Sequence, residues 1–207
     1  MSTALGWNLI TLPSIPAAPA SIEYMPTDIV GISRSTFTNG EQVFNYGMSY
    51  WRWSISMPLM PEPIAQPWLA FLMALQGIGN VFQIGDPRRQ SPQGTGAGTP
   101  VVNGGSQTGY SLSTRGWTPG LVLKAGDYLM IGYRLYRATA DVTYTSGSVS
   151  VPIWPNLRES PVDGASIATS NTKGLFRLEK NDRLWKISSQ RVYSINFEAI
   201  EVINAVS

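Results

Sequence analysis

The side chains of this sequence that could carry acid–base chemistry are carboxylates, because the chain contains no histidine and no cysteine. Asp127, Asp141 and Asp163 could supply the carboxylate pair that a glycosidase needs. However, Asp127 follows a glycine and Asp163 precedes one, and turn chemistry explains both. Glu198 and Glu201 are three positions apart on an expected strand, so they point to opposite faces. The sequence therefore predicts no catalytic residues and no enzyme.

Binding chemistry for a cofactor is equally sparse. Without histidine and cysteine there is no disulfide, no thiolate nucleophile and no zinc site built from these residues. Gly94, Gly96 and Gly98 superficially resemble a phosphate-binding loop, but the strand before and the helix after that such a loop requires are missing. We interpret this stretch as a flexible linker and predict no cofactor and no metal.

Aromatic residues in the second half of the chain offer a different kind of site. Small OB-like barrels present aromatic side chains to sugars or bases, although core filling and subunit contacts explain such residues equally well. We name four candidates for contact with a ligand or a peripheral protein: Trp117, Tyr133, Tyr136 and Trp154.

The segment from Arg34 to Pro87 must position any site in the first half. Its residues predict a hairpin of strands Gln42–Tyr46 and Tyr50–Met57 around Gly47. In the second strand Trp51 and Trp53 share one face, and that face is either core or interface. Candidate interface residues are Trp51, Arg52, Trp53 and Trp68.

A helix and a short strand complete that segment. Residues 64–76 carry apolar side chains at helical spacing, with Pro67 expected in the first turn and Gly77 just past the end. A strand over Val81–Gly85 then stops at Gly85-Asp86-Pro87.

The rest of the chain predicts a second module. Residues 88–120 are rich in Gly, Ser, Thr and Pro and are interpreted as linkers, after which short strands alternate with turns as in a small barrel or sandwich. The expected strands are 121–123, 128–131, 135–143, 149–154, 175–178, 185–188 and 190–202. We predict a mainly β fold: a β-sandwich with one helix (21–87 and 174–207), an inserted small OB-like β-barrel (88–173) and an extended N-terminal arm (1–20).

Composition points to a protein that contacts other proteins. Only 14% of residues are charged, against roughly 25% in an average soluble domain. Interface cores are depleted in charge, although a loop-rich β protein with a Ser/Thr/Gly surface could show the same composition. A net charge of +2 without a basic patch gives no case for nucleic-acid recognition, and no apolar run suits a membrane helix.

Four stretches of the chain resemble distal tail proteins of long-tailed bacteriophages, which form the ring between the tail tube and the tip or baseplate. They are RSTFTNGEQVFNY, SYWRWSISMPLMPEP with its proline exit, WLAFLMALQGIGNVFQIGDP and LKAGDYLMIGYRLYRATADV, and the resemblance covers most of residues 30–200. It implies a β-sandwich belt with one helix, assembled as a six-fold ring. Some members carry a second, OB-like barrel, which would suit residues 88–173.

The expected function is therefore structural. The chain would form a homohexameric ring with the tail tube protein on one face and hub or tip proteins on the other. Its location would be the tail tip of the virion, and the host cytoplasm during assembly. Alternatives are a carbohydrate-binding tail module, a glycan-degrading enzyme acting through carboxylates, or another tail or neck ring such as a tail terminator.

Overall fold

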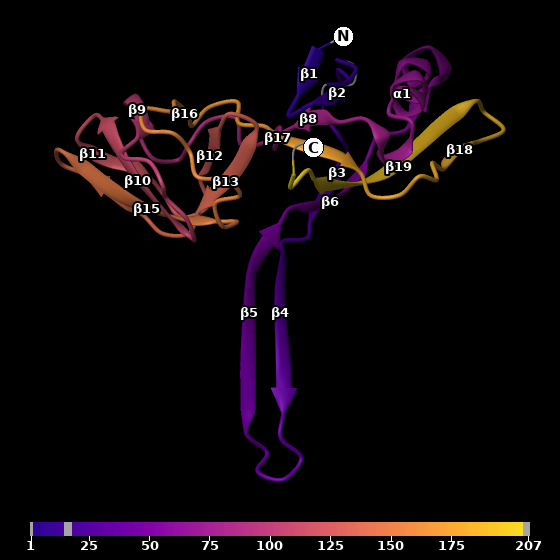
Figure 1. The fold of residues 1–207 in the computed structure, drawn as a ribbon. Coiled ribbons are helices and arrows are strands. Elements are labelled where there is room, and N and C mark those ends of the chain that lie inside the picture. The colour runs from indigo at the N-terminus through magenta and orange to yellow at the C-terminus, as the bar shows by residue number, and fades with distance from the viewer. Residues whose placement is uncertain (1, 15–17, 205–207) are drawn as a thin grey trace.

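The computed structural model describes residues 2–14 and 18–204, and within them the fold is mainly β with one α-helix. This confirms the predicted fold class. Two lobes lie side by side, one carrying the helix and one formed by a barrel-like sheet, and a long hairpin projects away from the junction between them (Figure 1). We call these the helix lobe, the barrel lobe and the projecting hairpin.

The helix lobe is built on a sheet whose strands come from both halves of the chain. Its order is β3-β6-β19-β17-β8, and β7 and β18 also pair with β19. Along β19 buried and more exposed residues alternate, as predicted from its sequence, because one face of the sheet packs against the helix. The strands are β3 (Ser21–Tyr24), β6 (Arg52–Ser56), β7 (Met60–Pro61), β8 (Phe82–Ile84), β17 (Gly174–Leu178), β18 (Trp185–Ile187) and β19 (Val192–Glu201).

Helix α1 (Glu62–Ala74) covers the core face of this sheet. The ring of Trp68 lies 6.4 Å from that of Phe197 on β19, and the predicted apolar face is buried. Two details of the prediction were wrong. The helix begins at Glu62, so Pro67 lies in its interior rather than in the first turn, and Gln76 rather than Gly77 is the first residue past the helix with left-handed backbone (φ 51°).

The tryptophans predicted as interface residues fill the core of this lobe. Trp51, Trp53 and Trp68 are each at most 4% exposed. The Trp53 ring lies 4.5 Å from that of Phe176 on β17 and 6.1 Å from that of Trp51. Their burial contradicts the predicted interface role, because a side chain enclosed within its own chain cannot contact a partner.

The barrel lobe contains a six-stranded sheet in the order β16-β12-β13-β15-β10-β9, and a bridge between Val101 and Ser166 brings its two ends together. A separate pair, β11 and β14, contributes to the same core. The strands are β9 (Gly98–Val102), β10 (Ser111–Trp117), β11 (Gly120–Leu123), β12 (Tyr128–Ile131), β13 (Arg134–Ala138), β14 (Val142–Tyr144), β15 (Ser148–Trp154) and β16 (Ile167–Ala168).

Two parts of the barrel differ from the prediction. Residues 88–120, interpreted as linkers, contain β9 and β10, and the expected strand 135–143 is two strands in different sheets. The glycines serve close packing rather than flexibility. A Cβ at Gly94 would lie 2.4 Å from the carbonyl oxygen of Val122, and one at Gly98 would lie 2.5 Å from that of Gly116.

The start of the chain also differs from the predicted extended arm. Strands β1 (Ser2–Ala4) and β2 (Trp7–Leu9) form a small hairpin. Ala4 packs with Val81, Leu175 and Val202, and a bridge joins Leu9 to Val81. These contacts place the segment on its own helix lobe. Residues 1 and 15–17 of the predicted arm lie outside the described residues.

The predicted hairpin around Gly47 is wrong as well. Strand β5 (Glu41–Tyr50) continues through Gly47, which lies beside a register shift, and pairs with β4 (Thr27–Arg34). The turn of this projecting hairpin lies at residues 35–40, where Asn39 has left-handed backbone (φ 54°). The chain then enters β6 after Trp51, so the hairpin leads directly into the core.

Candidate functional site

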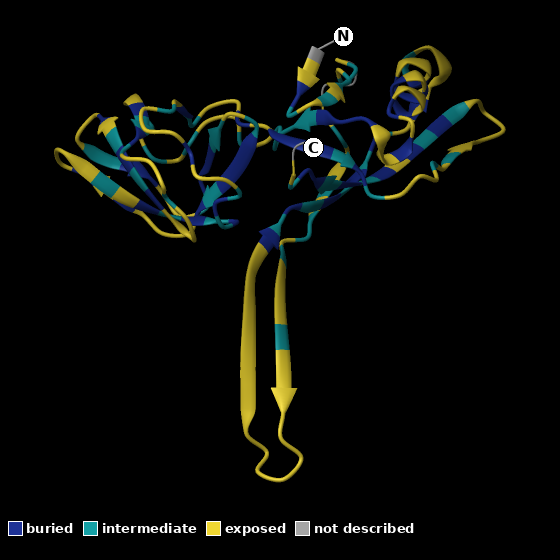
Figure 2. Cartoon of the chain, in the orientation of Figure 1, coloured by how far each residue is buried: buried dark blue, intermediate teal, exposed yellow. Residues whose placement is uncertain are grey.

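The projecting hairpin exposes an unusual amount of apolar surface. From Thr27 to Ser33 and from Glu41 to Met48 nearly every residue is exposed (Figure 2). Its large apolar side chains are between 38% and 98% exposed, with Phe37 at the tip the most exposed: Ile29, Val30, Ile32, Phe37, Val43, Phe44, Tyr46 and Met48. Large exposed apolar patches mark interaction sites, so the hairpin is the leading candidate for the functional surface.

Both faces of the ribbon are apolar. Ile32 and Val43 are direct cross-strand partners on one face. The other face carries Phe44, opposite Gly31, and the ring of Tyr46 lies across that glycine, 3.2 Å from where its Cβ would be. An ordinary half-buried hairpin keeps one face polar, so this one lacks a face suited to water.

The few charged side chains of the hairpin lie near its two ends and have partners. Arg34 forms an ion pair with Glu41 near the tip. Asp28, at the base, accepts a hydrogen bond of 2.9 Å from the indole nitrogen of Trp154. The middle of the hairpin, between these ends, carries no charged side chain.

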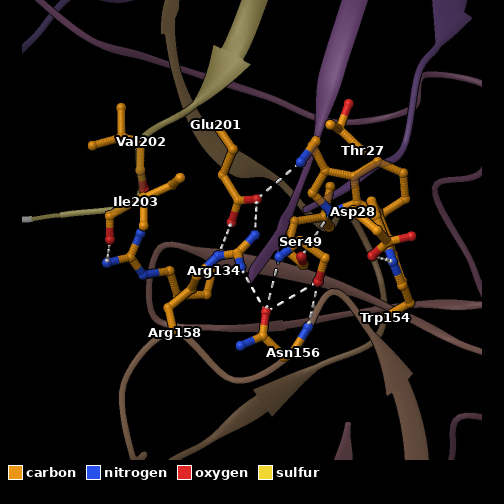
Figure 3. A network of polar contacts seen from close by, with 12 residues as sticks. Thr27, Asp28, Ser49, Arg134, Trp154, Asn156, Arg158, Glu201, Val202 and Ile203 are labelled. Atoms are coloured by element: carbon orange, nitrogen blue, oxygen red, sulfur yellow. Dashed lines mark hydrogen bonds and ion pairs between the residues drawn. The ribbon is translucent and has the colours of Figure 1, made fainter. Parts of the chain in front are cut away.

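The base of the hairpin is clamped by the barrel lobe (Figure 3). Asn156, just after β15, accepts hydrogen bonds from the backbone N–H (3.3 Å) and the hydroxyl (3.0 Å) of Ser49, and its side-chain amide donates to the carbonyl of Gly47 (2.6 Å). Ser49 is fully buried. The hairpin is therefore held at its root by side chains from the other lobe.

A buried ion pair holds Asn156 and the start of the core in place at the base of the hairpin. Arg158 and Glu201 are joined at 2.7 Å, and their side chains are only 4% and 3% exposed. The arginine also donates to the Asn156 amide oxygen at 2.9 Å, and the carboxylate accepts from the backbone N–H of Trp51 at 3.1 Å. One network thus connects Glu201 on β19, residues 156–158 just after β15, and Trp51, where the hairpin joins the core (Figure 3).

Further hydrogen bonds fix the two lobes to each other. The indole nitrogen of Trp51 donates to the carbonyl of Leu135 on β13 at 2.9 Å. The buried guanidinium of Arg134 donates to the carbonyls of Val202 and Ile203 just past β19. We call the hydrogen bonds and ion pairs of this and the two preceding paragraphs the hairpin anchor.

The four predicted ligand-contact aromatics do not form one open surface. Trp117 and Tyr136 are buried in the barrel core. Tyr133 packs on the cluster around the N-terminal hairpin, and Trp154 packs edge-on against Trp51 with ring centroids 4.5 Å apart. The structure thus places two in the core and two at the junction with the helix lobe.

Arg52, the last predicted interface residue, and the three aspartates considered and rejected as catalytic groups all have structural partners. Arg52, on the sheet face opposite the tryptophans, pairs with Glu179 at 2.6 Å and keeps 36% of its side chain exposed. Asp127 is buried and accepts three backbone hydrogen bonds, one of them from Gly94 at 2.9 Å. Asp141 accepts one from a backbone N–H and Asp163 pairs with Arg115. These carboxylates hold turns in place.

Sequence reasoning missed the projecting hairpin and its anchor. The Asn39-Gly40 dipeptide between two β-rich runs was the available signal for the hairpin turn. No local signal could have paired Arg158 with Glu201, because the two residues lie far apart in the sequence.

Tyr136, in the barrel core, makes the stability of the folded chain depend on pH. Burial raises the pKa of its phenol to about 12, from about 10 in an unfolded chain. The phenol therefore contributes stability that is complete below pH 10 and is lost as the pH rises toward 12. We expect the unfolding free energy to fall across this window, and to fall less steeply in Tyr136→Phe. Denaturant titrations at several pH values, with the exposed Tyr110→Phe as control, measure the difference; equal slopes in all three chains would contradict it.

Compared with known protein families and with curated proteins, the chain matches no family model and none of the curated sequences. In the described residues no group of three or more His, Cys, Asp or Glu side chains could hold a metal ion. Among the described residues no helix combines the length and the apolar character needed to cross a membrane.

Proposed function

We propose that this protein is a virion structural component that forms a ring at the distal end of a bacteriophage tail. The ring would join the tail tube to hub or tip proteins. The projecting hairpin is the observation that carries the proposal: buried polar contacts hold its root, yet among the described residues its large apolar side chains stay 38–98% exposed. Such a surface needs a protein partner to cover it.

Two further observations support the same proposal. The low charge of the chain suits a protein whose surface is largely covered by neighbours. The mainly β fold, with one helix and a second barrel-like lobe, is the architecture that the resemblance to distal tail proteins implies. In this proposal the barrel lobe holds peripheral tip components. None of the four barrel aromatics favours a glycan-binding role, because two are buried in the core and two lie at the lobe junction.

The mass of the purified protein in solution tests the proposal. We expect native mass spectrometry and light scattering to show a closed oligomer of about six times the 22.6 kDa chain. Antibody labelling of phage particles should then locate the protein at the tail tip. A monomer at all concentrations that is also absent from particles would sink the proposal.

A further inference from the structure

The two edges of the projecting hairpin are as unprotected as its faces. Within the described residues β4 and β5 pair with each other and with no third strand, so no strand covers their outer edges; Asn156 holds only the base of β5, at Gly47 and Ser49. Natural edge strands are usually short, or carry lysine, proline or bulges that block pairing. Strands β4 and β5 span eight and ten residues, contain neither lysine nor proline, and have one irregularity, near the base at Ile29/Val30.

The exposed apolar area is large enough to stabilise an interface. The eight large apolar side chains of the hairpin together expose roughly 800 Å², if each fully exposed side chain presents about 150–200 Å². A standard interface buries about 800 Å² on each partner, whereas the largest patch on a typical monomer is about 300–600 Å². A two-stranded hairpin is also only marginally stable alone in water. The hairpin thus has both the area and the need for a partner along its length.

Rotational symmetry supplies partners for both edges at once. The hairpin projects away from the line through the two lobes (Figure 1). If the lobes lie in the plane of a ring, the hairpins run along its axis. Rotation about that axis preserves strand direction, so β5 of one copy is automatically antiparallel to β4 of the next. The same contact repeats head to tail until the ring closes, and no edge remains.

We propose that the projecting hairpins of successive copies of this chain pair edge to edge, β5 of one with β4 of the next, and form an up-and-down β-barrel on the ring axis. This inference rests on the proposed ring and names the contact that closes it. One apolar face lines the inside of the barrel and the other covers its outside. The hairpin anchor holds each hairpin at the angle that pairing requires.

The absence of cysteine makes a clean crosslinking test possible. Ser33 and Gln42 are cross-strand partners and so lie at the same height on the ribbon. A rotation keeps that height, so Gln42 of one copy lies beside Ser33 of the next. Chains carrying Ser33→Cys and chains carrying Gln42→Cys are first treated separately with a short bismaleimide. The two are then mixed under conditions that allow subunits to exchange, and the mixture is treated in the same way. The spacer of the reagent tolerates the difference in height that strand tilt adds.

We expect covalent dimers at least ten-fold more abundant in the mixture than in either variant alone. Efficient crosslinking of Ser33→Cys with itself would mean a two-fold contact and would overturn the proposal. An oligomer of the expected mass that gives no crosslink would overturn the hairpin pairing and leave the ring intact. A wild-type chain that stays monomeric would overturn the ring itself, so the two failures are distinguishable.

A charge test checks the same contact independently. Ile32→Lys and Val43→Lys place ammonium groups on the middle of the ribbon, where both side chains are at least 60% exposed. We expect each to weaken assembly by ten-fold or more and to leave unfolding of the monomer unchanged. The matched control is Leu184→Lys, at an equally exposed apolar residue next to β18. Assembly that is weakened equally by all three changes would contradict a specific role for the hairpin.

Discussion

Replacing Glu201 by glutamine should destabilise the folded chain by about 3–5 kcal/mol, the usual cost of removing one partner from a buried ion pair. The change leaves the guanidinium of Arg158 buried without a counter-charge, because both side chains are almost fully enclosed. The carboxylate oxygen that accepts from the backbone N–H of Trp51 is also at risk, since an amide nitrogen cannot accept a hydrogen bond. Denaturant unfolding followed by tryptophan fluorescence measures the loss.

The same strand supplies the control. Glu198 pairs with Lys180 at 2.9 Å, but both side chains are well exposed, so Glu198→Gln should cost about 1 kcal/mol or less. Replacing both Arg158 and Glu201 by leucine should cost less than Glu201→Gln alone, because no unpaired charge remains. If the two glutamine variants unfolded at the same denaturant concentration, the ion pair would not be the support of the hairpin anchor.

Gly85→Ala should have the second large effect, a loss of about 3 kcal/mol from overpacking. A Cβ at Gly85 would lie 1.9 Å from the carbonyl oxygen of Thr172, which is backbone and cannot rotate away. These residues follow β8 and precede β17, which pair with each other where the chain leaves the helix lobe for the barrel and returns. The added methyl group must therefore separate two strands of the main sheet.

Gly79→Ala is the matched control for this substitution. Its Cβ would come no closer than 3.9 Å to the nearest neighbour, the Cβ of Gln76, and its backbone is not in the left-handed region. We expect a change within about 0.5 kcal/mol, as for ordinary surface substitutions. Thermal unfolding of the two variants decides the matter; equal melting temperatures would show that the sheet adapts at Gly85.

The predictable part of the fold was the part with one buried face. The alternation in β6 and β19 and the helical spacing in α1 follow directly from burial against a single core, so residue patterns locate these elements. The glycine-rich stretch before β11 could not be interpreted in this way. Whether Gly94 gives flexibility or close packing depends on the backbone of Val122, which lies elsewhere in the sequence.

The candidate site was harder to predict, for a related reason. Trp53 on β6 and the large apolar residues of β4 and β5 all lie on strands, yet the tryptophan is enclosed and the hairpin residues are exposed. An apolar residue type indicates that a side chain favours burial, but it does not tell whether the residues that cover it belong to the same chain. That distinction needs the three-dimensional arrangement.

The position of β19 in the chain has a consequence for the order of folding. The strands of the barrel lobe all lie between Gly98 and Ala168, so this lobe can fold while synthesis continues. The helix lobe forms only after β19 has been synthesised, because β19 is its central strand and carries Glu201. During translation the hairpin therefore emerges well before Glu201, which accepts a hydrogen bond from Trp51 at its root and pairs with Arg158. Until β19 is available the hairpin lacks a complete anchor, so the pairing of hairpins proposed above would begin only after β19 has joined the sheet.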